Sequence, residues 1–260
     1  MPRKSRRADT QVMHKSGQGK IVHPAFDDSG DTEWNPLDRD RASRIVPEYT
    51  RDQSYLKRVK PRTDGQRDLM TSIKTHALTM AVGPAGTGKT YLAIAAAVEA
   101  LEAGKIERII LSRPAMEAGE SIGFLPGDML DKMAPYLRPL YDAMGDRLGA
   151  KRVKQYMDDG TIEIAPVGFM RGRTLNNAFV VIDEAQNCTY AQLKMLLSRL
   201  GWHSTMVVTG DPDQTDLLPG ISGLSDTVAR LETLETVGIV KLTQVDIVRH
   251  PLVAEMLGVL

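Results

Sequence analysis

The chain has 260 residues, a length that suits one sizeable α/β domain with a substantial buried core. Basic and acidic side chains balance at 33 each, so the overall charge does not by itself indicate a nucleic-acid partner, and a hydrophobic content of 42% is ordinary for a globular protein. The single cysteine, Cys188, excludes an internal disulfide framework, and no apolar run approaches the roughly 20 residues that cross a bilayer.

Residues 1–60 contain few large aliphatic side chains and many Arg, Asp, Gly, Ser and Pro residues. Because this composition buries too little surface to offset the entropy of ordering, we predict a basic, mixed-charge arm that is largely disordered or extended. Both a solubilising tail and a nucleic-acid contact fit its charges. Its basic residues have no apolar stretch behind them, so it is not a secretory signal, and we expect a cytoplasmic protein with no membrane partner.

Residues 61–260 have a different hydrophobic pattern, in which short apolar runs alternate with segments whose apolar residues recur at helical spacing. The clearest helical patterns are Tyr91–Ala103 and Tyr190–Leu200. Six strands are predicted, at Leu78–Val82, Ile106–Leu111, Thr161–Ala165, Phe179–Ile182, Thr205–Thr209 and Gly238–Leu242. Strands that alternate with helices predict an α/β fold with a central, mostly parallel sheet flanked by helices and with ligands at the carboxyl ends of the strands.

A phosphate-binding loop, or P-loop, follows the first predicted strand and precedes an Ala-rich helix. It matches G-x-x-x-x-G-K-[ST] in full, and its glycines let backbone N–H groups point at phosphates. We expect Lys89 to neutralise the β- and γ-phosphates of ATP and the Thr90 hydroxyl to ligate Mg²⁺. The residues expected to bind nucleotide here are Gly83, Pro84, Ala85, Gly86, Thr87, Gly88, Lys89, Thr90 and Tyr91.

Two acidic residues end the strand Phe179–Ile182 about ninety residues further on. We expect Asp183 to hold Mg²⁺ directly or through water, and Glu184 to accept a proton from the attacking water. The next strand ends in Gly-Asp-Pro-Asp-Gln at residues 210–214. We expect Gln214, at the same edge of the sheet, to contact the γ-phosphate or the water.

These three motifs together resemble motifs I, II and III of superfamily 1 helicases, and the chain as a whole resembles the PhoH family of ATPases over about residues 66–260. The segments that carry the closer resemblance are Ser112–Glu120, Gly123–Gly127, Met170–Leu175, Asp183–Asn187 and Asp246–Pro251. The resemblance implies a single RecA-like ATPase domain that is often assembled as a ring, for example a hexamer, and that is linked to RNA.

The resemblance also implies two further site residues. Gln66 precedes the first core strand, where related helicases place a glutamine that reads adenine. Arg249 lies late in the domain and is expected to face the γ-phosphate, from its own subunit or from a neighbour. Arg113, Arg171 and Arg173 are lesser candidates for that arginine or for contacts to nucleic-acid phosphates.

One RecA-like domain cannot close a nucleotide cleft alone, so we expect either a homo-oligomeric ring or a protein that is not a processive motor. RNA or another single-stranded nucleic acid is the expected partner. Some PhoH relatives carry an N-terminal nuclease domain that the sequence lacks, so we expect no ribonuclease activity. The alternatives are a nucleotide-gated assembly protein and a P-loop kinase for small molecules. Cys188 is expected to be a small buried side chain.

Overall fold

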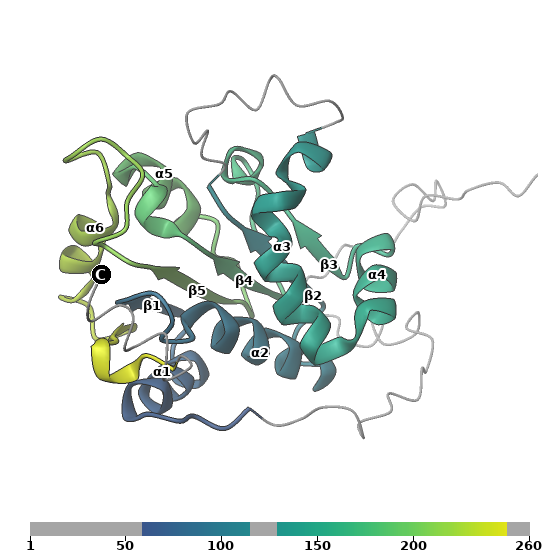
Figure 1. Cartoon of the computed structure of the whole chain (residues 1–260). Helices are drawn as coiled ribbons and strands as arrows, with labels where there is room; N and C mark the ends of the chain where they lie inside the picture. Colours follow the sequence, from purple (N-terminus) through teal and green to yellow (C-terminus); the bar gives the residue numbers. More distant parts are fainter. Residues whose placement is uncertain (1–58, 115–128, 249–260) are drawn as a thin grey trace, which may run out of the picture. The chain divides into compact units, whose positions relative to one another are not determined.

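The computed structural model describes residues 59–114 and 129–248 (Figure 1). The predicted arm therefore lies outside the described residues except for its last two, and Arg249 lies outside them as well. No helix in the described ranges combines the length and the apolar character that a membrane-spanning segment needs.

The core of the fold is one sheet of six strands in the order β3–β2–β4–β5–β1–β6, and every neighbouring pair is parallel. The strands are β1 (Leu78–Val82), β2 (Arg108–Ser112), β3 (Ile162–Ile164), β4 (Ala178–Ile182), β5 (Thr205–Gly210) and β6 (Val237–Lys241). All residues of β1 and β4 are buried, as expected of parallel strands that are covered on both faces. The predicted α/β class and all six predicted strands are confirmed, with small shifts at their ends.

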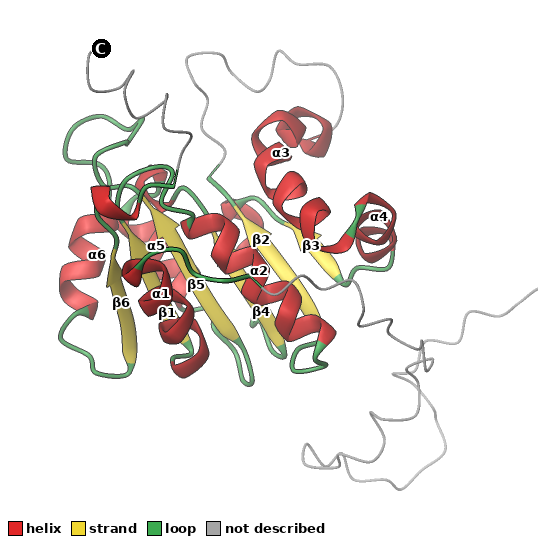
Figure 2. Cartoon of the chain, turned by 60° about the horizontal axis from the view of Figure 1, so that its bottom comes forward, coloured by secondary structure: helices red, strands yellow, loops and turns green. Residues whose placement is uncertain are grey.

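Helices cover the two faces of this sheet (Figure 2). Side chains of α1 (Asp64–Thr75), α2 (Lys89–Glu102) and α3 (Met129–Leu148) form one hydrophobic cluster with Val181 and Val207. Side chains of α5 (Tyr190–Leu197) and α6 (Leu224–Leu231) form the other with Val180 and Val208. Because successive residues of a strand point to opposite faces, central strands such as β4 and β5 contribute to both clusters. The result is a three-layer, RecA-like domain, to which α4 (Ala150–Asp158) and the 3-10 turns η4 (Val167–Met170), η5 (Ala185–Asn187) and η6 (Gln244–Asp246) are added.

Two of the helices, α1 and α5, begin at capping residues that the sequence supplies. The Thr63 hydroxyl accepts a hydrogen bond from the backbone of Gln66 at the start of α1, and Thr189 and Gln192 form a capping box at the start of α5. The predicted helix over Tyr190–Leu200 ends earlier, at Leu197. The reason is that the chain then pairs with Leu175, whose backbone N–H donates to the carbonyl of Arg199.

The strand order brings three chain segments to one edge of the sheet. β5 lies between β1, which leads into the P-loop, and β4, which leads into the acidic pair. The carboxyl ends of parallel strands share one edge, so the residues that follow β1, β4 and β5 are neighbours in space although they are far apart in the sequence.

Candidate nucleotide-binding site

The P-loop joins β1 to α2 and depends on its glycines for its shape. Gly83, Gly86 and Gly88 have φ angles of 142°, 84° and 84°, in the region that other residues rarely adopt. At Gly83 a Cβ atom would also lie 2.2 Å from the carbonyl oxygen of Leu242. The loop therefore passes close to the end of β6, and only glycine fits there.

The Lys89 ammonium lies inside the P-loop. It donates hydrogen bonds to the carbonyl oxygens of Gly83 at 2.6 Å and Pro84 at 2.8 Å. Burial lowers the pKa of Lys89, an effect that the nearby carboxylates of Asp211, Asp183 and Glu184 oppose. A buried cation ringed by carbonyl groups at the start of a helix is well placed to meet an anionic ligand.

Asp183 joins the P-loop helix to the sheet. Its Oδ1 atom accepts hydrogen bonds from the hydroxyl of Thr90 at 2.6 Å and from the hydroxyl of Thr209 at 2.7 Å. The side chain of Asp183 is buried. A carboxylate and a hydroxyl oxygen in contact are ligands of the hard kind that Mg²⁺ prefers, so Thr90 and Asp183 fit the predicted metal site.

Glu184 follows at once and is held from two sides. Its Oε1 atom accepts a hydrogen bond from Nη2 of Arg113 at 3.1 Å, and its Oε2 atom accepts one from Nε2 of Gln186 at 2.5 Å. The backbone of Glu184 is left-handed, with φ 53° and ψ 42°. Such a conformation costs a residue other than glycine on the order of 1–3 kcal/mol and is concentrated at functional sites.

Asp211 is a candidate site residue that the sequence did not single out. Its Oδ2 atom accepts a hydrogen bond from the backbone N–H of Ala85 in the P-loop at 3.1 Å. Its own backbone N–H donates to Oε1 of the buried Gln186 at 3.1 Å. The sequence does contain a signal for Asp211, because it is the first acidic residue after β5. In the sequence analysis we instead predict Gln214 from the same segment.

Gln66 lies against the P-loop, 21 residues before the backbone atom that it contacts. Its Nε2 atom donates to the carbonyl of Thr87 at 3.0 Å, and its Oε1 atom accepts from the backbone of Arg62 at 2.9 Å. A primary amide has a second donor hydrogen and a second acceptor lone pair, which a purine could use. Its role in reading adenine stays a prediction. Tyr91, on α2, is 38% exposed.

Three other predicted residues have different outcomes. Gln214 is exposed on the turn after β5, where its backbone N–H donates to the carbonyl of Asp211 at 3.1 Å, and its contact with a γ-phosphate stays a prediction. Arg249 lies outside the described residues, but the residue before it, Val248, donates its backbone N–H to the carbonyl of Gly86 at 3.0 Å. Arg173 forms two hydrogen bonds with Glu163, at 2.5 and 2.6 Å, which engage its guanidinium.

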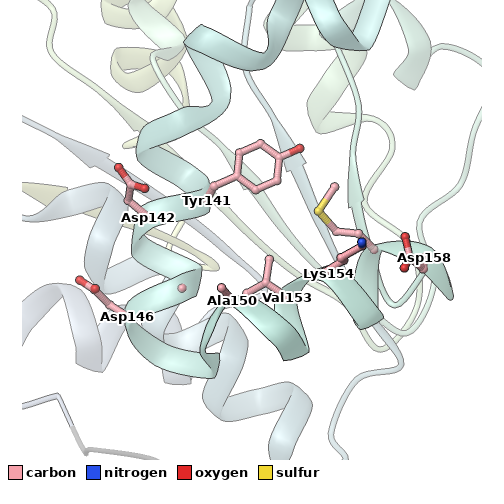
Figure 3. Close-up of a pocket in the computed structure, with 9 residues that line it drawn as sticks. Tyr141, Asp142, Asp146, Ala150, Val153, Lys154 and Asp158 are labelled. Carbon is pink, nitrogen blue, oxygen red and sulfur yellow. The ribbon is translucent and has the colours of Figure 1, made fainter.

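The surface of the described residues includes two pockets that bear on the choice of site. One, of about 500 Å³, borders the P-loop, and its lining includes Gly83, Pro84 and Asp211. The larger one, of about 640 Å³, lies between α3 and α4, with Tyr141, Asp146 and Lys154 among its lining residues (Figure 3). None of the motif residues lines the larger pocket, so the chemistry of the motifs, and not pocket size, identifies the candidate site.

The family model of PhoH-like proteins matches residues 58–260, which is most of the chain. The chain belongs to the PhoH family. A PhoH-like protein of Bacillus subtilis (strain 168) is 53% identical over 202 residues, which cover 77% of this chain and 63% of that protein. A PhoH-like protein of Synechocystis is 52% identical over 197 residues, covering 75% and 60%. Protein PhoH of Escherichia coli (strain K12) is 46% identical over 205 residues, covering 78% and 58%.

The chain spans less than two thirds of the length of these curated relatives. Among solved structures, the large terminase of a thermophilic bacteriophage aligns with a TM-score of 0.48 and 12% identity, covering 76% of this chain and 50% of that one. Similarity at that level carries no statement about activity.

Proposed function

We propose that this PhoH-family chain binds Mg-ATP on residues 83–90 and hydrolyses it to ADP and phosphate. The proposal rests above all on the 2.6 Å contact between the Thr90 hydroxyl and the Asp183 carboxylate. This contact joins the end of a complete P-loop to the acidic end of β4, so one face of the protein carries both phosphate-binding and metal-binding groups.

The reaction assigns a role to each side chain. The P-loop amides and the Lys89 ammonium hold the phosphates, and Thr90 and Asp183 hold Mg²⁺, which when bound offsets phosphate charge. A water oxygen forms a bond to the γ-phosphorus while the bond to the bridging oxygen of ADP breaks. The proton of that water passes to the Glu184 carboxylate. Water is the favoured acceptor because a carboxylate follows the metal-binding residue directly.

We further propose that the chain acts as a homo-oligomeric ring on RNA or another single-stranded nucleic acid. One sheet with one P-loop is present in the described ranges, and a second copy would supply the other wall of a nucleotide cleft. The family resemblance supports the link to RNA. Arg249 is the residue that we propose to reach the γ-phosphate, in its own subunit or in the next one.

The decisive experiment measures the rate of phosphate release from ATP over a range of protein concentrations, with and without single-stranded RNA. A rate per subunit that rises with concentration supports a site shared between copies, and stimulation by RNA supports the proposed partner. Single-stranded DNA of the same sequence distinguishes the two nucleic acids. If the purified protein with Mg²⁺ neither binds nor cleaves ATP at any concentration, the proposal fails.

A further inference from the structure

We propose that Arg113 restrains Glu184 in the nucleotide-free protein and must release it before ATP is hydrolysed. Arg113 follows β2, and Glu184 follows the neighbouring strand β4, 71 residues later. This inference rests on the proposed ATPase function, because it assigns Glu184 the role of proton acceptor. Arg113 is thus a positioning residue that acts through Glu184.

The geometry shows a carboxylate that is fixed in place. The Arg113 guanidinium lies 3.1 Å from one oxygen of Glu184 and also 3.9 Å from the Asp183 carboxylate, so it spans both acids. Gln186 holds the second oxygen of Glu184. A general base must come within hydrogen-bond reach of the proton that it takes, and a carboxylate anchored on both oxygens cannot move toward a water without giving up one anchor.

Arg113 is the anchor that can be released. Its side chain is 20% exposed, and that of Glu184 is 36% exposed, so their contact lies at the surface of the site. Gln186 in contrast is buried, and its Oε1 atom is engaged by the backbone of Asp211. The buried anchor is therefore built into the fold, whereas the partly exposed Arg113–Glu184 contact is the one that we infer to be released.

A chain of contacts connects this restraint to the P-loop. Gln186 contacts both Glu184 and the backbone of Asp211, and the Asp211 carboxylate contacts the backbone N–H of Ala85. Phosphates that bind the P-loop amides compete for that N–H group. We therefore infer that nucleotide binding at Ala85 weakens this series of contacts as far as Glu184, which Arg113 holds.

The first test compares ATP turnover by the wild type and by Arg113→Gln, which keeps most of the side-chain length but removes the charge. We expect kcat/KM to rise about two- to five-fold, the rate equivalent of a partly exposed ion pair. The Kd of a fluorescent, non-hydrolysable ATP analogue should fall by a similar factor, because binding no longer has to break the ion pair. Arg230→Gln is the matched control, since Arg230 pairs with Asp226 on the surface of α6, and its kcat/KM and Kd should equal those of the wild type.

The second test needs no turnover. Unfolding temperatures of the wild type, Arg113→Gln, Glu184→Ala and the double variant form a double-mutant cycle. We expect the two losses to be non-additive in the free protein and additive when the analogue and Mg²⁺ are bound, because the contact is then broken.

Three results would overturn the restraint. A lower kcat/KM in Arg113→Gln would make Arg113 an aid to catalysis, an unchanged kcat/KM and Kd would make the ion pair merely structural, and equal coupling with and without the analogue would show that it is never released. If the wild type binds the analogue but does not cleave ATP, the proposed function is refuted instead. The double-mutant cycle would still decide whether nucleotide binding releases Glu184 from Arg113.

Discussion

The hydroxyl of Thr209 on β5 donates a hydrogen bond of 2.7 Å to the carboxylate of Asp183, the residue that follows the neighbouring strand β4. The same oxygen accepts from Thr90. Two threonines from separate elements therefore set the direction of one carboxylate. A metal ligand oriented by such a partner depends on it for its affinity.

Thr209→Val should weaken this orientation, because valine keeps the shape of threonine and removes the hydroxyl. We expect a loss of about 1 kcal/mol in the free energy of unfolding and a higher Mg²⁺ requirement for ATP binding. Denaturant unfolding and Mg²⁺ titration with a fluorescent nucleotide measure the two effects. Thr205→Val, at the start of the same strand, is the control, and an equal Mg²⁺ requirement in both variants would contradict the prediction.

Lys89→Ala should lose nucleotide affinity. Removal of a charge-assisted contact to phosphate costs roughly 1.5–3 kcal/mol, which corresponds to about ten- to a hundred-fold in Kd. Titration with a fluorescent ATP analogue measures the change. Lys105→Ala removes an exposed lysine after α2 and should bind normally. Normal binding by Lys89→Ala would exclude the P-loop as the phosphate site.

Glu184→Gln should bind ATP and hydrolyse it slowly. The amide keeps the size of the side chain but cannot accept the proton of the attacking water, so we expect kcat to fall by roughly 10²–10⁴ with little change in Kd. Rapid-mix phosphate release together with analogue titration separates the two quantities. Glu235→Gln, an exposed change in the turn before β6, is the control. Full turnover by Glu184→Gln would remove it from the mechanism.

Cys188 should be unreactive in the folded protein. Its side chain is buried, and burial raises the pKa of the thiol to about 12. In the unfolded chain the thiol ionises above its ordinary pKa of 9.0, whereas the native state keeps its proton, so the stability that Cys188 contributes falls as pH rises from about 9 to 12. A thiol reagent should modify the native protein slowly at pH 8 and modify it fully in denaturant. Rapid native labelling would contradict the burial.

Asp246→Asn should destabilise the protein near neutral pH and progressively less in acid. The Thr63 hydroxyl and backbone groups of Thr243 and Gly65 lower the pKa of Asp246 below its ordinary value of 3.8. The carboxylate therefore stabilises the fold above pH 3.8, and this contribution is lost as pH falls through the lower, native pKa. Urea unfolding at pH 6 should show a less stable variant, and the gap to the wild type should narrow in stronger acid.

Gly65 provides the space for that carboxylate. A Cβ at position 65 would lie 2.6 Å from both carboxylate oxygens of Asp246. Gly65→Ala should therefore lower the free energy of unfolding at every pH, because it disrupts the contact between α1 and η6. If Gly65→Ala were as stable as the wild type, the contact between α1 and η6 would be looser than the structure has it.

The sheet and the two main motifs were predictable because their signals are local. Apolar runs such as Phe179–Ile182 identify buried strands. Residues 83–90 match a pattern in which glycine is required because other residues rarely adopt the backbone angles of the loop. The sequence also predicts that Asp183 lies near the P-loop, since an acid that ends a buried strand lies at the ligand-binding edge. The 2.6 Å contact of Asp183 with Thr90 agrees with that expectation.

The remaining contacts of the candidate site were not predictable, because they depend on the order of the strands. Nothing in the sequence says that β5 lies between β1 and β4, and only that order brings Asp211 to Ala85 and Thr209 to Asp183. The left-handed backbone of Glu184 is equally hidden, since glutamate does not favour it. The pairing of Arg173 with Glu163 depends on an edge strand of three residues, which carries little local pattern.

The position of the Lys89 ammonium has a thermodynamic consequence for ligand choice. Since the carbonyl groups of Gly83 and Pro84 already satisfy this cation, an incoming anion has to displace internal partners instead of filling a gap. A single orthophosphate recovers few contacts in that exchange, whereas a chain of three phosphates recovers many along the loop. We therefore expect the resting site to bind orthophosphate much more weakly than a triphosphate.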